Sequence, residues 1–495
     1  MALIRILVLQ VFIVMINSSL CAQTLQLSAN PIDDNGFEHV KLIGQDEDGF
    51  YLLMSNLSVE NNRSRQGLRA RKYEISYFGM DLQPKWRKKA DEFPVKGNIE
   101  GIGIFQGKVV ILSSEVSKEN NFTLFLSVVD RGASSIISSR VIGNWEYTKN
   151  QDYRSPELLI SPDRTLLGVC TSVYNAGKAD LQLHVLDENL NSHLQINHSG
   201  VFDAKEISTV QFLLSDSSTL VMLSRTMEEI PGQKLKTELF TLHLFDSDNA
   251  QKREFALNLP QQPMNEAAIA IHSPSNTVLA TGFISDKTAF TGASLLLAKL
   301  PLSNPDGFMR SIGKFQKDTQ INLIGQRNKG PGSDLASYPI LQIIPRSDGG
   351  VLLITEAAYT SEYNFYDYFT QTFNRRIEYH YDNVVVLSVN ADGGIHWSQV
   401  VQKEQRSMDD EGVFSSIKAM IGEQSLSVLY NMQKGKSNEI VFHEIDAAGH
   451  MGNRQMIRQS DNISLLTRFG KQVAQNTIVF PAYTRKRLYL LKAVF

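Results

Sequence analysis

The chain has 495 residues, of which 42% are hydrophobic and 20% are charged, and it contains only 2 cysteines. This is the composition of an ordinary globular protein, and it excludes a disordered, collagen-like or disulfide-stapled chain. Because 49 basic residues stand against 52 acidic ones, the net charge of −3 excludes a general positive field for nucleic acid.

The first 22 residues have the pattern of a secretory signal peptide. Arg5 precedes an apolar run from Ile6 to Ile16, which is too short to span a bilayer as a helix. We therefore expect cleavage after Ala22 and export, either to the periplasm or to the outer surface. The alternative is a lipoprotein acylated at Cys21, but such sites favour Gly, Ala or Ser before the cysteine, and Leu20 stands there.

Cleavage would leave Cys170 as the only cysteine, so no internal disulfide can form. The run Leu166–Cys170 is apolar, which predicts a buried strand residue rather than a nucleophile. No later stretch approaches the roughly 18 continuous apolar residues that a transmembrane helix needs. We expect an exported protein without a transmembrane segment, with residues 23–495 forming its one folded domain.

A repeat runs through these residues. A polar turn followed by a strongly apolar strand recurs at fairly regular intervals, and the eight copies begin at Asp48, Gln106, Asp163, Asp216, Ser275, Asp348, Glu423 and Gln475. Dipeptides such as Asp48-Gly49 and Gln106-Gly107 supply the positive φ angles that tight hairpin turns require. Each copy therefore predicts two antiparallel strands.

A second strand pattern recurs in step with the first, and it ends in aspartate. Examples are Leu124–Asp130, Leu181–Asp187, Phe240–Asp246 and Ile440–Asp446. The two patterns together predict four-stranded antiparallel units, with no long amphipathic helix between them. Eight such units in one chain predict an all-β, eight-bladed β-propeller, and a seven-bladed propeller is the alternative.

The two ends of the chain are expected to share one blade. The eighth unit ends after its third strand, Arg487–Val494, and therefore lacks an outermost strand. The segment Leu25–Ala29 can supply that strand, which would remove two sheet edges and close the ring. The sequence thus predicts hydrogen bonding between Leu25–Ala29 and Leu488–Val494.

The longest predicted loops join strands two and three of a blade or join successive blades. Both kinds of loop emerge on the same face of a propeller. These loops include Asn56–Lys72, Met227–Lys236, Ala357–Asp382, Arg87–Asn98, Gly143–Pro156, Arg327–Tyr338 and Lys403–Gly412. Long loops on a rigid scaffold commonly carry function. We take this loop-rich face as the candidate working surface.

The segment Ala357–Asp382 is an aromatic-rich hairpin insertion in this face. Aromatic and arginine side chains suit protein or glycan surfaces, so we predict the binding residues to be Tyr359, Tyr363, Phe365, Tyr366, Tyr368, Phe369, Phe373, Arg375, Arg376 and Tyr379. The alternative is that these side chains pack on one another and on the sixth blade. A basic loop (Arg63, Arg65, Arg69, Arg71, Lys72) and an acidic run (Asp409, Asp410, Glu411) are interpreted as solvated charge.

The stretches Tyr379–Val386 and Asn390–Trp397 resemble exported β-propeller-like proteins of Bacteroidota bacteria, whose function is uncharacterised. The end of the leader, Leu20–Gln23, resembles leaders from the same phylum. The resemblance is specific over roughly Val351–Ser415. It implies a propeller fold and an exported location, and it implies no catalytic residue.

Motifs for chemistry are scarce. His184, His243 and His443 occupy one position of the repeat, but equivalent positions in different blades are too far apart to converge on one metal ion. Asp392–Trp397 is similar to the Asp-box of sialidases, which is a structural element. The sequence contains no phosphate-binding loop, nucleophile elbow or His-Glu-x-x-His motif.

These observations predict a binding or scaffolding module that contacts a protein or a cell-surface glycan at the cell envelope through its loop-rich face. We expect no cofactor, no metal and no nucleic-acid partner. The alternative is a polysaccharide hydrolase or lyase with carboxylates at the mouth of the central channel. An acid-lined pocket on the ring axis would favour that enzyme, whereas an aromatic surface away from the axis would favour recognition.

Overall fold

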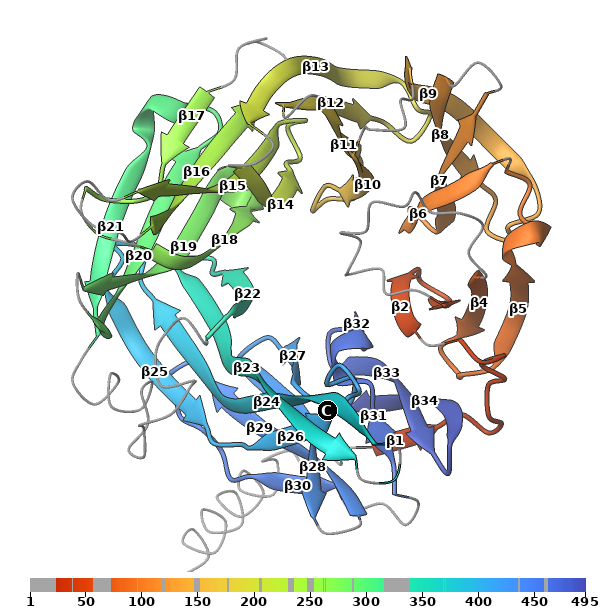
Figure 1. The fold of residues 1–495 in the computed structure, drawn as a ribbon, viewed down its shortest axis with the longest axis vertical. Helices are drawn as coiled ribbons and strands as arrows, with labels where there is room; N and C mark the ends of the chain where they lie inside the picture. Colours follow the sequence, from red (N-terminus) through yellow and green to blue (C-terminus); the bar gives the residue numbers. More distant parts are fainter. Residues whose placement is uncertain are drawn as a thin grey trace, which may run out of the picture.

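The computed structural model describes residues 24–495 except residues 38, 57–72, 96, 118–120, 147–151, 176–177, 204–206, 230–235, 247–252, 261, 263, 287–288, 316–337, 368, 370, 435–436 and 458–461. Within the described residues the strands form eight antiparallel sheets, which stand around a common axis (Figure 1). The prediction of an eight-bladed β-propeller is confirmed, and the seven-bladed alternative is wrong. The predicted leader lies outside the described residues.

Blades one to seven each take four consecutive strands, from the axis outward. Blades one and two contain β2 (His39–Gln45), β3 (Gly49–Ser55), β4 (Tyr73–Gly79), β5 (Pro84–Lys89), β6 (Asn98–Phe105), β7 (Lys108–Val116), β8 (Asn121–Val129) and β9 (Ile136–Glu146). Blades three and four contain β10 (Asp152–Ile160), β11 (Leu167–Asn175), β12 (Lys178–Leu186), β13 (Ser192–Asp203), β14 (Ile207–Leu214), β15 (Leu220–Glu229), β16 (Lys236–Phe245) and β17 (Arg253–Ala256).

The second half of the ring follows the same order. Blades five and six contain β18 (Met264–His272), β19 (Thr277–Asp286), β20 (Ala289–Pro301), β21 (Met309–Lys314), β22 (Ile340–Pro345), β23 (Val351–Asp367), β24 (Thr372–Val389), β25 (Ile395–Val401) and β26 (Gln405–Met408). Blades seven and eight contain β27 (Ile417–Ile421), β28 (Ser425–Lys434), β29 (Ser437–Asp446), β30 (Gln455–Ile457), β31 (Ser464–Leu465), β32 (Lys471–Ala474), β33 (Thr477–Thr484), β34 (Arg487–Val494) and β1 (Thr24–Leu27).

Helix is confined to single 3-10 turns in the described chain, at η1 (Ala90–Glu92), η2 (Ser273–Ser275), η3 (Pro305–Gly307) and η5 (Thr467–Phe469). Among these residues no helix is long and apolar enough to cross a membrane.

The two ends of the chain share blade eight, as predicted. Strand β1 pairs antiparallel with β34, with Thr24 opposite Val494 and Leu27 opposite Leu491. The backbone amides of Ser28 and Ile32 extend this pairing to the carbonyls of Leu490 and Leu488. The ends of the chain therefore hold each other in one sheet, and the third strand of that blade is not an open edge.

The core consists of the layers between neighbouring blades. In the described chain, eight clusters of buried apolar side chains each join two successive blades, and one of them joins blade eight to blade one. Strand β3 shows how this arises, because Phe50, Leu52 and Met54 face blade eight while Tyr51 and Leu53 face blade two. Successive side chains on a strand point to opposite faces, so a central strand buried on both sides is apolar throughout.

The innermost strands share an irregularity that the repeat did not predict. In the part of the chain that the structure describes, seven of them (β2, β6, β10, β14, β18, β22 and β32) shift register against the second strand of their blade. Such β-bulges bend a strand and redirect its side chains. Cys170 is buried on β11, as predicted, and burial raises the pKa of its thiol.

Several predicted loops are shorter than expected. Strand β9 extends to Glu146 and β10 begins at Asp152, so most of Gly143–Pro156 is strand. The segment Lys403–Gly412 contains β26, which pairs with β24 from Glu378↔Met408 to Tyr381↔Gln405. Alternation of buried and exposed residues is too brief in a four-residue strand to be recognised in the sequence.

Candidate functional site

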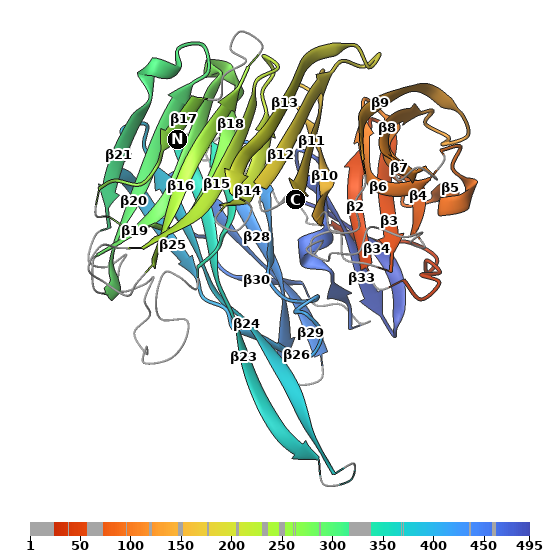
Figure 2. The ribbon, with the colours of Figure 1, turned by 45° about the horizontal axis from the view of Figure 1, so that its top comes forward.

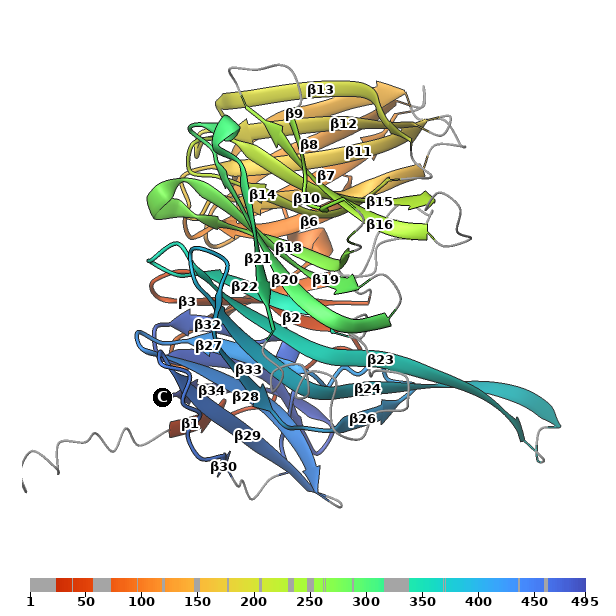
Figure 3. The ribbon, with the colours of Figure 1, turned by 90° about the vertical axis from the view of Figure 1, so that its left-hand side faces the viewer.

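The aromatic segment is an extension of the second and third strands of blade six, with a β-bulge between Glu356 and Ala358 where the extension begins. Strands β23 and β24 pair from Val351↔Val389 to Asp367↔Thr372, so the whole predicted insertion is β-hairpin. The hairpin leaves the body of the propeller and projects beyond it along the direction of the ring axis (Figures 2 and 3). We call residues 361–376 the distal hairpin.

The strand register divides the predicted binding residues between the two faces of the hairpin, because directly paired residues point to the same side. One face carries Tyr359, Tyr363, Phe365 and Arg376, together with His380 of β24 and Met408 of β26. The other face carries Tyr366, Phe373, Arg375 and Tyr379. Phe369 lies in the turn, and Tyr368 lies outside the described residues. The structure therefore does not gather the predicted residues into one flat patch.

On the face that carries Tyr363, the rings contact neighbouring side chains, although Tyr363 itself is 41% exposed. Tyr359 stacks on His380 at a centroid distance of 4.5 Å and an interplanar angle of 6°. The guanidinium of Arg376 lies 4.8 Å from the centre of the Phe365 ring, and the Tyr363 hydroxyl lies 3.4 Å from the sulfur of Met408. On this face the aromatic rings therefore contact non-aromatic or histidine side chains of the same blade rather than one another.

Near the end of the hairpin the aromatic side chains are open to solvent. Phe369 is 101% exposed and Phe373 is 78% exposed, while Tyr366 is 40% exposed and contacts the Phe373 ring at 5.0 Å. Arg375 forms an ion pair with Glu362 on the same face. Large apolar side chains that are exposed in the same segment often mark an interaction site.

The base of the hairpin is held by a buried ion pair between Glu356 of β23 and Lys403, which follows β25. The Nζ atom of Lys403 lies 2.6 Å from Oε1 of Glu356, and their side chains are 1% and 0% exposed. Lys403 also donates to the Tyr381 carbonyl at 2.8 Å and to Oε1 of Gln405 at 2.7 Å, so all its donors are satisfied. Burial lowers the pKa of Lys403, and Glu356 opposes that shift.

Further hydrogen bonds carry this network into the next two blades. Ser416 donates through its hydroxyl to Glu356 and through its backbone amide to Gln405. Gln405 donates to the Asn431 carbonyl at 2.7 Å, and Asn431 exchanges two hydrogen bonds with the backbone of Leu465 in blade eight. We call Glu356, Lys403, Gln405 and Ser416 the hairpin base; connected buried networks of this kind restrict the motion of the segments that they join.

Asp409, the first residue of the acidic run, contacts the hairpin. Asp409 accepts from the Ile377 amide at 2.9 Å, and its own amide donates to the Ile377 carbonyl at 3.0 Å. Its carboxylate lies 3.8 Å from Nε of Arg376. Asp409 therefore has a structural role at the hairpin, contrary to its interpretation as solvated charge. The basic loop with Arg63 to Lys72 lies outside the described residues.

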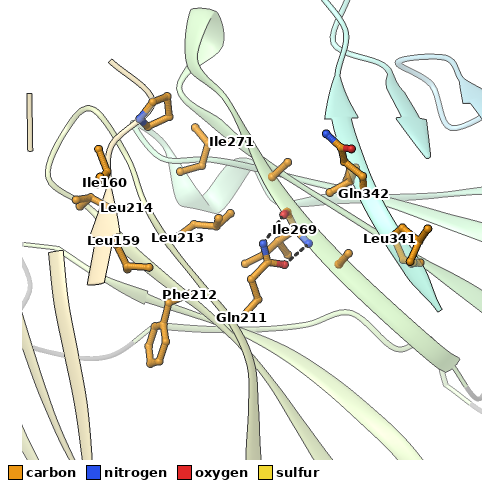
Figure 4. Close-up of a pocket in the computed structure, with 15 residues that line it drawn as sticks. Leu159, Ile160, Gln211, Phe212, Leu213, Leu214, Ile269, Ile271, Leu341 and Gln342 are labelled. Carbon is orange, nitrogen blue, oxygen red and sulfur yellow. Dashed lines mark hydrogen bonds between the residues drawn. The ribbon is translucent and has the colours of Figure 1, made fainter. Parts of the chain in front are cut away.

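A second candidate surface lies at the ring axis. The innermost strands of blades three to six line a pocket of about 500 Å³, with residues such as Leu159, Leu213, Ile269, Ile271 and Leu341 in its wall (Figure 4). Gln211 closes part of this wall, because its side-chain amide exchanges two hydrogen bonds of 3.1 Å with the backbone of Ile269 in the next blade. The pocket lining contains no carboxylate.

The carboxyl group with the clearest upward pKa shift among the described residues lies on β18, beyond that lining. The pKa of Glu266 is raised to about 7, chiefly by burial, while Arg225 opposes the shift and Glu238 adds to it. Arg225 itself forms an ion pair with Glu238 at 3.3 Å. The pocket therefore does not assemble the two convergent carboxylates that a glycosidase requires.

The three repeat histidines lie on the third strands of blades three, four and seven and are all buried. His243 hydrogen-bonds to the Ser224 hydroxyl at 2.6 Å and His443 to that of Tyr430 at 3.3 Å, whereas burial lowers the pKa of His184 to about 4. The described residues contain no group of three or more His, Cys, Asp or Glu side chains that could hold a metal ion. Each histidine is a packing residue of its own blade.

The Asp-box-like turn is structural, as its pattern indicates. Asp392 accepts from the Gly394 amide at 2.9 Å and thereby shapes the turn. Trp397 packs between blades six and seven and donates to the Ala447 carbonyl at 3.1 Å. The turn therefore fixes one blade against the next.

The sequence matches no protein-family model and no curated protein. Solved structures with a similar arrangement include the Dos1 propeller (TM-score 0.43, 8% identity, covering 92% of this chain and 93% of that chain). Chaetomium thermophilum Sqt1 bound to the N-terminus of the ribosomal protein L10 has a TM-score of 0.41 and 10% identity, covering 93% and 97%. Polysaccharide lyase Uly1 has a TM-score of 0.36 and 9% identity, covering 92% and 99%. One fold supports many activities, so the function is argued from the site.

Proposed function

We propose that the protein is an exported β-propeller that acts as a binding module at the cell envelope, and that its distal hairpin inserts aromatic side chains into a partner protein. The observation that carries this proposal is the exposure of Phe369 and Phe373 at the far end of a hairpin whose base is rigid. A rigid support reduces the entropy lost when the exposed rings become buried at an interface.

A partner protein fits the hairpin better than a glycan does. Sugars stack on open aromatic faces, whereas the rings of Tyr359 and Phe365 already lie against His380 and Arg376. The rings that remain exposed are phenylalanines, which bring no hydrogen-bonding group to a sugar. Insertion into an apolar pocket buries them fully, and each buried phenylalanine contributes about 2 kcal/mol.

Site-specific photo-crosslinking tests this proposal. A photoreactive phenylalanine analogue replaces Phe369, and in the matched control it replaces Met309, which is 60% exposed on the outermost strand of blade five. We expect position 369 to crosslink one envelope protein that position 309 does not. The purified pair should bind, and Phe369→Ser with Phe373→Ser should weaken that binding at least about tenfold.

Two results would contradict the proposal. One is that positions 369 and 309 give the same crosslinked products. The other is that the purified pair binds the double variant with unchanged affinity. Crosslinks to carbohydrate that survive complete protease digestion would instead identify a glycan as the partner.

A further inference from the structure

The two edges of the hairpin differ in how their backbone groups are used. On the β24 edge, the Ile377 carbonyl accepts from the Asp409 amide at 3.0 Å, and the Ile377 amide donates to Oδ1 of Asp409 at 2.9 Å. Both backbone groups of Ile377 therefore point away from β23. The Asp409 carboxylate takes the amide that a continuing strand would use, so the β24 edge is capped where β26 ends.

This orientation establishes which backbone groups of β23 face outward. Along a strand the backbone groups of successive residues point to opposite edges, and directly opposed residues of an antiparallel pair either bond each other or both face away. Ile377 is the register partner of Glu362. Since the backbone groups of Ile377 face away from β23, those of Glu362 face away from β24. The alternation gives Thr360 and Asn364 the same outward direction.

These three residues of β23 form an open edge. Strand β22 pairs with β23 only from Val351 to Thr355. Among the described strands, β24 alone pairs with Thr360, Glu362 and Asn364, whose side chains are exposed. Beyond the end of β26 the hairpin stands clear of the other strands (Figures 2 and 3). Outward N–H and C=O groups in such a row are a template for pairing with another chain.

The side chains beside the open edge indicate which segment would fit there. Tyr363 and Phe365 lie on one face of β23, and Tyr363 is 41% exposed. Glu362 lies on the other face and is 51% exposed. An added strand would place its side chains alternately on these two faces. Apolar side chains suit the aromatic face, and basic side chains suit the face with Glu362, because opposite charges stabilise cross-strand neighbours.

We propose that the open edge binds an extended protein segment, in which apolar and basic residues alternate, as an added β-strand. Hydrogen bonds to the backbone of Thr360, Glu362 and Asn364 supply affinity, and the alternating side chains supply selectivity. The inference rests on the proposed function, since it places a segment of the partner beside the inserted rings of Phe369 and Phe373.

Fluorescence anisotropy with synthetic peptides tests the open edge without the natural partner. The probes are labelled octapeptides with blocked ends, one alternating valine with lysine and the other alternating valine with glutamate. We expect the valine–lysine peptide to bind the purified protein saturably. The valine–glutamate peptide should bind at least about fivefold more weakly, because it places like charges beside Glu362.

A proline at the open edge tests the backbone contacts. The Asn364 amide faces outward, so Asn364→Pro removes no hydrogen bond to β24, but it should weaken binding of the valine–lysine peptide at least about tenfold. The matched control is Arg375→Pro at the register partner of Asn364, where the amide faces the other edge. This control should bind at least as tightly as the parent, because it also frees Glu362 from its ion pair.

Two further measurements do not depend on how well the proline variants fold. Glu362→Gln changes an exposed side chain and should reduce the preference for lysine over glutamate. Hydrogen exchange resolved to single residues should show fast exchange of the Asn364 amide in the free protein and slow exchange with the valine–lysine peptide bound. The amides of Tyr363 and Phe365, which face β24, should exchange slowly in both states.

The inference is overturned if the valine–lysine peptide does not bind saturably, if both peptides bind equally, or if a folded Asn364→Pro protein binds as the parent does. It is also overturned if peptide binding leaves the exchange of the Asn364 amide unchanged. Failure of the proposed function looks different, because position 369 would then crosslink no specific partner while the peptide results stand.

Discussion

The hairpin base and the distal hairpin lie at opposite ends of the β23–β24 extension and differ in what they do for the molecule. At the base, Glu356 and Lys403 are almost fully buried and every donor of Lys403 has an acceptor. At the far end, Phe369 and Phe373 are exposed to water. The base therefore belongs to the packed interior, whereas these two rings lie mostly in solvent.

The largest effect is expected at the buried ion pair. Lys403→Ala leaves the Glu356 carboxylate buried without its partner, which should lower the free energy of unfolding by about 3–5 kcal/mol. Chemical denaturation measures this loss. Lys85→Ala, which removes an exposed ion pair of 3.7 Å with Asp81, is the control and should cause no measurable loss. Equal effects of the two variants would show that the base does not hold the hairpin.

A smaller loss is expected at Gly412, where the chain turns beside the hairpin. Gly412 has a φ of +63°, and an added Cβ would lie 2.4 Å from the Tyr381 ring, so Gly412→Ala should destabilise the protein by about 2 kcal/mol. Gly36→Ala is matched to it, since Gly36 has a φ of +71° with no atom within 4 Å of its Cβ position. A difference in thermal unfolding between the two variants isolates the contact with Tyr381.

The pH dependence of stability probes Asp382, which accepts a hydrogen bond from Tyr359 at 3.2 Å close to the base. Burial raises the pKa of Asp382, and the Tyr359 hydroxyl opposes that shift. A carboxyl whose pKa is higher in the folded state stabilises the fold below its unfolded pKa of about 4, and this contribution is lost as the pH rises through the folded value.

Asp382→Asn should remove that pH dependence. Its free energy of unfolding should exceed that of the parent at pH 7, and the difference should disappear towards pH 3. Denaturation at a series of pH values measures it. A parent protein whose stability rises with pH relative to the variant would contradict the assigned direction of the shift.

The smallest effect on stability is expected in the distal hairpin. Phe369→Ser and Phe373→Ser remove side chains that are 101% and 78% exposed, so thermal unfolding should not change measurably. A clear loss of stability would show that these rings pack against the protein and would end their interpretation as exposed binding groups.

The sequence was sufficient to predict the blades. Each blade contributes a polar turn followed by an apolar strand, and a second strand pattern recurs in step with the first. It also predicted the shared blade, since an eighth unit without a fourth strand leaves Leu25–Ala29 as its complement. Both predictions rest on local patterns that recur along the chain. A copy that matches the pattern poorly can therefore still be recognised from the spacing of the others.

The site was harder to predict. The aromatic composition located the hairpin, but only the register of β23 against β24 separates Tyr363 from Tyr366. Lys403 and Gln405 lie in a short polar segment that is indistinguishable from a surface loop, and their burial depends on contacts with Glu356 and Asn431 from distant segments. The axial pocket likewise combines innermost strands of four blades, so no single segment carries its signature.

The most direct test of the binding role is to excise the distal hairpin and leave its base intact. Glu362 and Ile377 are register partners, so replacing Tyr363–Arg376 by Asn-Gly should close a short two-residue turn between them. We expect this variant to unfold at the same temperature as the parent but to lose at least about a hundredfold in affinity for the partner crosslinked at position 369. Unchanged affinity in a variant that folds normally would contradict it.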